Sequence, residues 1–192
     1  MLRAGYDWMM RLAASPRADR ALAIVAFLES SIFPIPPDAM IVPMILARPG
    51  RAWRIVLIAT VASVLGGLAG YAIGYFLYET LGRRVIELYG LAEKAEQYRL
   101  AYAEWGLWII LIKGLTPIPY KLVTIASGLA AFDIWVFTLA SIVTRGARFL
   151  LVAALLRAFG SPIRRFIEER LTLVTTAFAA AIVLGFVALR YL

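Results

Sequence analysis

The chain has 192 residues, of which 62% are hydrophobic and only 17% are charged, and its mean hydropathy is +0.82. This composition excludes a soluble globular enzyme, whose surface must carry more charge, and indicates one integral membrane domain over residues 1–192. Because the sequence has neither Cys nor His, it also excludes Ser-His-Asp triads and metal sites built on these ligands. We therefore expect no enzymatic activity, metal or cofactor. The net charge of +8 is typical of Arg clusters that set membrane topology, so we expect no nucleic-acid partner.

The N-terminal part predicts a surface helix followed by an interrupted membrane segment. Residues 1–18 mix apolar and charged side chains, which is typical of an amphipathic helix at a membrane interface. Residues 20–47 are long enough to span a bilayer but contain Glu29, Asp38 and a proline-rich centre: Pro34, Pro36 and Pro37. Proline breaks a helix, so each arm beside this centre keeps about 10–13 residues, whereas a full span needs about 20. We interpret residues 20–47 as a re-entrant hairpin, with two half-length helices that enter and leave the membrane on one side.

The rest of the chain predicts a second hairpin among ordinary spanning helices. Residues 53–81 are apolar and predict a spanning helix, and the mixed-charge residues 82–104 predict a helix on the bilayer surface. Residues 105–132 form another interrupted segment, which we interpret as the second re-entrant hairpin, because Pro117 and Pro119 break it next to Thr116. Two more spanning helices are predicted over residues 134–157 and 171–190, with a basic loop between them.

The two interrupted segments match each other. Placing Pro34 on Pro117 puts Pro36 on Pro119 and Asp38 on Lys121, and a Trp and a spanning helix follow each segment. Paired interrupted helices at corresponding positions are typical of inverted-repeat transporters, whose binding sites lie near the middle of the membrane. The predicted fold is an all-α polytopic membrane protein with two opposed re-entrant helical hairpins in an inverted-repeat arrangement, about three spanning helices and amphipathic surface helices.

The distribution of basic residues predicts the orientation. If both hairpins return to their own side, the N-terminus, the turn at 48–54 and the loop at 157–170 share one side, which carries most of the Arg residues. The opposite side carries fewer basic residues: Arg83, Arg84, Lys94, Arg99 and Arg190. By the positive-inside rule, we expect a multi-pass protein whose N-terminus is cytoplasmic.

Six ionisable residues lie within the predicted membrane segments: Glu29, Asp38, Lys113, Lys121, Arg145 and Arg148. Each costs about 2.5–3.5 kcal/mol at the centre of a membrane helix, so we expect them to have a role. One interpretation is mutual neutralisation, in which ion pairs join a hairpin to a helix. That interpretation leaves bases in excess of acids, and an anion or a phosphate group is their natural partner. The candidate anion-binding residues are Lys113, Thr116, Tyr120, Lys121, Arg145 and Arg148.

Two roles are open to the acids. A carboxyl group removed from water holds its proton more tightly, so Glu29 and Asp38 are candidates for proton coupling or gating. Asp38 is equally well placed to cap the half-helix that it begins, by accepting backbone N–H bonds.

A stripe of small residues runs along the predicted 53–81 helix: Ala62, Gly66, Gly70 and Gly74. Such a stripe predicts close packing of helices. We expect it to pack internally on a hairpin, and the seam of a homo-oligomer is the alternative.

The residues around both breaks resemble a known family. The run Glu29–Asp38 is similar to the first hairpin of the DedA family, also called the SNARE-associated or VTT-domain family, in which a Glu precedes a proline-rich tip ending in an acid. The run Lys113–Gly128 resembles its second hairpin, and Thr144–Phe149 resembles the basic stretch of the following helix. The likeness covers residues 20–160 and is nearest to the small YqaA-like branch.

This resemblance implies a multi-pass protein of the bacterial inner membrane that supports envelope homeostasis. The family is associated with moving undecaprenyl phosphate or phospholipids between leaflets and with dependence on the proton motive force, and Glu29 and Asp38 match its acidic positions. Many members carry two Arg residues three positions before and after the second tip's first proline, where this chain has Gly114 and Tyr120. Lys113 and Lys121 lie one residue further out, and Lys lacks the bidentate fork of Arg.

These observations favour a flippase-like transporter of a phosphate-bearing lipid. Its expected partners are membrane lipids with an anionic phosphate headgroup, protons, and a second copy of the chain in a homo-oligomer. The alternatives are a proton-coupled transporter of a small solute or ion and a non-transporting membrane scaffold. In a transporter, the binding site would open alternately to the two sides of the membrane as one hairpin-plus-helix repeat rocks against the other.

Overall fold

A computed structural model of the chain describes residues 13, 15, 17–32, 36–115 and 120–169. In chain order its helices are α2 (Ala18–Ser31), α3 (Asp38–Ala47), the single turn η1 (Pro49–Arg51), α4 (Ala52–Leu77), the π-helical turn η2 (Tyr78–Gly82), α5 (Arg83–Leu88), α6 (Ala92–Leu115), α7 (Tyr120–Leu129) and α8 (Ile134–Glu169). The described part of the chain contains no strand, so the all-α prediction is confirmed.

Two helical stretches are long and apolar enough to cross a membrane, namely Pro49–Gly82 and Ile134–Gly160. They coincide with the spanning helices predicted at 53–81 and 134–157. At about 1.5 Å per residue, the first is about 51 Å long and exceeds the roughly 30 Å of a bilayer's hydrocarbon core. The spanning helix predicted at 171–190 and most of the amphipathic helix predicted at 1–18 lie outside the described residues.

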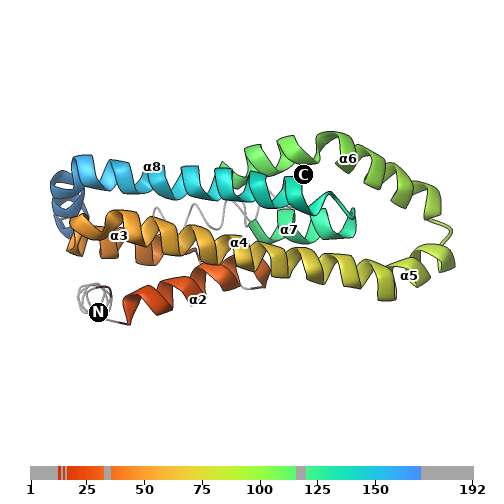
Figure 1. The fold of residues 1–192 in the computed structure, drawn as a ribbon, viewed down its shortest axis with the longest axis horizontal. Coiled ribbons are helices and arrows are strands. Elements are labelled where there is room, and N and C mark those ends of the chain that lie inside the picture. Colours follow the sequence, from red (N-terminus) through yellow and green to blue (C-terminus); the bar gives the residue numbers. More distant parts are fainter. Residues whose placement is uncertain (1–12, 14, 16, 33–35, 116–119, 170–192) are drawn as a thin grey trace.

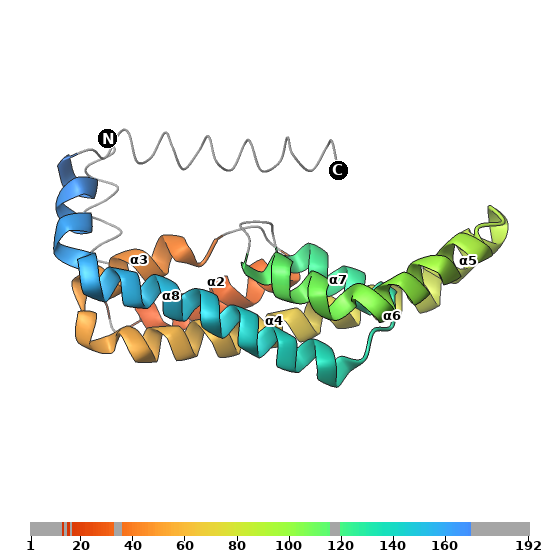
Figure 2. The same ribbon diagram turned by 90° about the horizontal axis from the view of Figure 1, so that it is seen from above.

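The chain doubles back at both predicted breaks. Helices α2 and α3 lie on either side of residues 33–35, and α6 and α7 lie on either side of residues 116–119. Figure 1 and Figure 2 show the two hairpins approaching each other from opposite ends of the molecule. That both arms of each hairpin enter a bilayer from one side stays a prediction.

The order of helices repeats along the chain. Helices α2, α3 and α4 correspond to α6, α7 and α8, and both second arms, α3 and α7, have 10 residues. Helix α4 packs against α2 and α7, whereas α8 packs against α6 and α3. Each long helix therefore holds the first arm of its own hairpin and the second arm of the other.

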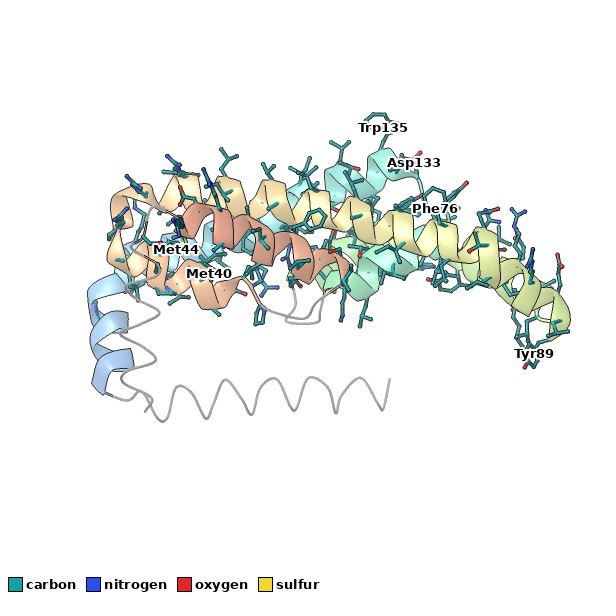
Figure 3. All side chains as sticks on the ribbon, turned by 90° about the horizontal axis from the view of Figure 1, so that it is seen from below. Met40, Met44, Phe76, Tyr89, Asp133 and Trp135 are labelled. Atoms are coloured by element: carbon teal, nitrogen blue, oxygen red, sulfur yellow. The ribbon has the colours of Figure 1, made fainter. Side chains whose placement is uncertain are left out.

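The mixed-charge segment differs from the prediction of a surface helix at 82–104. Helix α5 ends at Leu88, the chain turns at Gly90 with φ +63°, and α6 then runs unbroken past residue 104 to Leu115. The first part of α6 is rich in Ala, Glu, Lys and Gln, which favour helix, so the change from charged to apolar composition does not end it. Helix α5 and the first half of α6 project from the bundle as an arm, with Tyr89 at its tip (Figure 3).

The basic loop predicted at 157–170 is also helical. Helix α8 continues to Glu169, with a kink at Phe159, whose backbone has φ −120° and ψ 17°. Pro162 lies three residues further on and has no N–H for the carbonyl of residue 158, which is a physical cause for a kink at this point.

Basic residues lie at both ends of the bundle. Arg20, Arg51 and Arg54 lie where α2 and α4 begin, and Arg84 and Arg99 lie on the arm at the opposite end (Figure 2). The assignment of the first end to the cytoplasm stays a prediction.

Two apolar cores lie on either side of a polar layer. One core includes Ile45, Ala59 and Phe149, and the other includes Tyr71 and Phe137. On α4 the first core ends at Ala59 and the second begins near Tyr71, with buried Ser63 between them. On α8 the buried Arg145 lies between Phe137 and Phe149 in the same way.

The small-residue stripe packs inside the molecule. Ala62, Gly66, Gly70 and Gly74 are all buried. A Cβ atom at Gly66 would overlap the carbonyl oxygen of Phe27 in α2, and one at Gly74 would overlap that of Ile125 in α7. The absence of side chains on α4 thus lets α2 and α7 approach it backbone to backbone, as the internal-packing prediction requires.

Candidate functional site

Glu29, in the last turn of α2, joins three helices. Its Oε2 accepts hydrogen bonds from Nη2 of Arg145 in α8 at 2.8 Å and from Oγ of Ser30 at 3.1 Å. Its Oε1 accepts one from the backbone N–H of Tyr120, the first residue of α7, at 3.2 Å. A carboxylate at this position stabilises the positive end of the α7 dipole, so the acid of one hairpin caps a helix of the other.

Arg145 is the largest fully buried side chain in the described part of the protein, with 1% of the side chain exposed. Its Nε donates to Oγ of Ser63 at 2.7 Å, and Ser63 is itself 2.7 Å from Oγ of Ser30. Two aromatic rings lie close to the guanidinium, whose central carbon is 4.9 Å from the centroid of Tyr120 and 4.8 Å from that of Phe149. Pairing with a carboxylate and stacking on aromatic faces are the arrangements that allow a charge to be buried.

Arg148 and Asp38 form a second ion pair beside the first. Nη2 of Arg148 lies 2.6 Å from Oδ2 of Asp38, and each side chain is 22% exposed. Arg145 and Arg148 are three residues apart and share a face of α8, while Glu29 and Asp38 flank the first break. Mutual neutralisation, one of the two interpretations of these charges, is therefore present for both arginines.

The alternative that Asp38 caps its own helix is wrong. Helix α3 has no side-chain capping bond at its start, and the carboxylate of Asp38 contacts Arg148 instead. Pro36 and Pro37 directly precede α3, and their carbonyls accept bonds from the backbone N–H groups of residues 39–41. Proline suits this position because the first residues of a helix need no N–H partner within it.

Tyr120 and Lys121, both predicted to bind an anion, begin α7 and have different surroundings. The Tyr120 side chain is fully buried, and its hydroxyl pairs with Oγ of Ser141 at 2.6 Å. It therefore supports Arg145 rather than lining an open surface. Lys121 is partly exposed, and its Nζ donates to the carbonyl oxygen of Ile32 at 3.1 Å. Among the described residues, no acid lies within ion-pair distance of Lys121.

Several predicted site residues have no described side chain. Lys113 lies near the end of α6, but its side chain is outside the described part of the structure. Thr116, Pro117, Pro119 and Pro34 lie outside the described residues altogether. The structure therefore brings together Glu29, Asp38, Tyr120, Lys121, Arg145 and Arg148.

Sequence reasoning missed the residues that support the ion pairs. Ser30 and Ser63 connect the carboxylate to the guanidinium, Phe149 stacks on Arg145, and Ser141 anchors Tyr120. The available signal was the presence of Ser residues within apolar membrane segments, where an unpaired hydroxyl is costly. The signal for Phe149 was its spacing, because a residue four positions after Arg145 lies on the same face of a helix.

Comparison with known proteins assigns the chain to a family. The family model of the VTT domain matches residues 35–158. An uncharacterized protein of Haemophilus influenzae is 34% identical over 167 residues, covering 85% of this chain and 86% of its own length. An uncharacterized protein of Histophilus somni is 35% identical over 167 residues, covering 85% and 87%. No solved structure matches the chain. With most of its length matched in this way, the chain belongs to the VTT-domain family, the DedA family of membrane proteins.

Proposed function

We propose that this protein moves a phosphate-bearing lipid, such as undecaprenyl phosphate or a phospholipid, between the leaflets of the bacterial inner membrane. The headgroup would bind between the inner ends of the two hairpins, with the acyl chains in the surrounding lipid. In this proposal the N-terminus is cytoplasmic and the chain belongs to the YqaA-like branch of its family.

The excess of positive charge at the meeting point of the hairpins carries the proposal. Both acids of the polar layer are bound to arginines of α8, at 2.8 and 2.6 Å. Lys121 contacts a neutral carbonyl at the end of α2, so its charge is not matched by an acid of the described chain. A positive charge at the centre of a membrane protein attracts an anion, and a phosphate headgroup is the anion that a bilayer itself supplies.

The carboxylates of Glu29 and Asp38 could regulate how strongly the arginines of α8 bind a phosphate. A phosphate that approaches the arginines competes with the carboxylates of Glu29 and Asp38, and protonation of an acid removes it from the competition. Of the two pairs, Asp38–Arg148 is the more exposed and Glu29–Arg145 the deeper. A headgroup would therefore meet Arg148 before Arg145.

Lipid binding by the purified protein tests the proposal. Native mass spectrometry would compare the wild type with Lys121→Gln and Lys113→Gln, using undecaprenyl phosphate, phosphatidylethanolamine and a neutral diacylglycerol. Lys94→Gln is the matched control, because Lys94 lies in the arm at the end of the bundle and the substitution is the same. We expect selective retention of the phosphate-bearing lipids by the wild type and Lys94→Gln, and its loss in Lys121→Gln at unchanged thermal stability. Unselective retention that neither Lys121→Gln nor Lys113→Gln alters would contradict the headgroup site.

A scaffold is the second candidate, because both arginines are bound to acids within the chain. Lipid translocation in proteoliposomes separates the candidates. A transporter accelerates the appearance of a labelled phospholipid in the opposite leaflet, whereas a scaffold leaves the rate at that of empty vesicles. Flux of a small solute or of protons without any lipid requirement would instead favour the proton-coupled transporter.

A further inference from the structure

Two of the three nitrogens of the Arg145 guanidinium have hydrogen-bond partners. Nε is bonded to Ser63 and Nη2 to Glu29, and the central carbon lies within 5 Å of the ring centroids of Tyr120 and Phe149. The remaining nitrogen, Nη1, is buried and has no hydrogen-bond partner in the described part of the protein. Arg145 thus has two nitrogens, Nε and Nη2, that donate hydrogen bonds within the protein, and a third, Nη1, that has no acceptor among the described residues.

A buried donor without a partner is uncommon in folded proteins and calls for a physical explanation. An isolated guanidinium would turn to satisfy its donors, but the two aromatic rings close to its central carbon restrict the tilt of this one. The bonds of Nε and Nη2 fix its rotation within its own plane. Nη1 is therefore held in one direction, as a donor that is prepared for an acceptor outside the chain.

We infer that Nη1 of Arg145 donates to an anionic oxygen of the bound phosphate group, and that Phe149 is a positioning residue that holds the guanidinium in the orientation required for this contact. The inference rests on the proposed function and specifies how its phosphate is held. Charged hydrogen bonds to phosphate are short and directional, so a donor that can tilt loses much of its contribution.

Phe149 is the better test of this arrangement than Tyr120. Tyr120 also bonds Ser141 through its hydroxyl and Glu29 through its backbone, so its replacement disturbs several contacts. Phe149 offers Arg145 only the face of its ring. A matched control lies on the same helix, because Phe137 is also 0% exposed but packs against the ring of Tyr71, at an interplanar angle of 42°.

The experiment compares Phe149→Leu with Phe137→Leu in the full-length protein. Two probes are used: inorganic phosphate, titrated by calorimetry into protein in neutral detergent, and phosphatidic acid, presented in nanodiscs of phosphatidylcholine. We expect Phe149→Leu to weaken binding by about tenfold or more, the range for one hydrogen bond to a charged group. Phe137→Leu should change it by less than about twofold, because the ring of Phe137 packs on Tyr71 and not on the guanidinium of Arg145.

A rescue variant separates positioning from stability. Phe149→Tyr restores the ring but buries an added hydroxyl, so it should return binding to near the wild-type value while leaving thermal stability below it. Equal losses of binding in Phe149→Leu and Phe137→Leu, or no recovery in Phe149→Tyr, would overturn the inference and leave the proposed function standing. Wild-type protein that binds neither probe would contradict both. Dependence on Phe149 for both probes supports a site for the phosphate group itself, and dependence for phosphatidic acid alone supports a site that needs the whole lipid.

Discussion

The two long helices, α4 and α8, have the same place in the repeated topology but hold their hairpin arms by different chemistry. Helix α4 meets α2 and α7 through glycines, with backbone against backbone. Helix α8 meets the first hairpin through Arg145 and Arg148, each bound to an acid. On α8, a Cβ atom added at Gly146 would meet, among the described residues, only the side chain of Thr60, at an ordinary van der Waals distance.

This difference separates permanent contacts from exchangeable ones. A glycine packed on a carbonyl has no group that a ligand or a proton can replace, whereas a carboxylate on an arginine can be displaced by another anion or neutralised by a proton. Helix α4 packs closely against one arm of each hairpin, so the two repeats share a helix interface and are not separate bodies. Rocking one repeat against the other as rigid units would break the glycine contacts of α4. The two exchangeable contacts of the polar layer, Glu29–Arg145 and Asp38–Arg148, both involve α8.

The largest expected effect comes from breaking the buried pair on α8. Glu29→Gln leaves the guanidinium of Arg145 buried without a counter-charge, and we expect the free energy of unfolding to fall by about 3–5 kcal/mol. Denaturant titration in detergent micelles, followed by circular dichroism, measures it. The double variant Glu29→Gln/Arg145→Gln removes the stranded charge and should recover part of the loss. A double variant less stable than the single one would show that repulsion of an unpaired charge is not the cause.

Glycine contacts on α4 should come next in size. Gly74→Ala and Gly66→Ala each place a methyl group against a carbonyl of a neighbouring helix, and we expect a loss of about 1–3 kcal/mol from overpacking. The same unfolding measurement applies, with Gly50→Ala as the control. Gly50 has no atom within 4 Å of an added Cβ, so its replacement should change stability by less than about 0.5 kcal/mol. Wild-type stability in Gly74→Ala would contradict the close approach of α7 to α4.

The partly exposed pair on α8 should contribute least. Asp38→Asn removes an ion pair whose side chains are 22% exposed, and we expect a loss of about 1 kcal/mol or less. Salt sharpens the comparison, because ions screen exposed charges more than buried ones. The destabilisation by Asp38→Asn should shrink between low and high ionic strength, while that of Glu29→Gln stays constant. Equal salt dependence of the two would mean that both pairs are equally hydrated.

Local signals in the sequence predicted the elements of the fold but not all their boundaries. The prolines near residues 34 and 117 fixed both breaks, because proline acts on the backbone of its own segment. The change in composition near residue 104 suggested a boundary that α6 does not have, since a change from charged to apolar side chains leaves the helical backbone intact. The same holds for the basic segment after residue 157, which continues α8 beyond its kink.

Within the site, the sequence predicted the charged residues but not their partners. The spacing of Arg145 and Arg148 showed that they share a face, since that follows from helix geometry alone. Their pairing with Glu29 and Asp38 depends on how α8 crosses the first hairpin, which is a tertiary property. The free donor of Arg145 was likewise unpredictable, because it results from four separate neighbours.

Helix α6 is unbroken and therefore connects the projecting arm rigidly to the second break. At about 1.5 Å per residue, its 24 residues form a rod about 36 Å long that starts in the projecting arm and ends at Leu115, beside the second break. A rod of this kind converts a small tilt at its outer end into a displacement at its inner end. The arm, which carries charge and lies at one extremity of the molecule, is thus mechanically linked to the place where the two hairpins meet.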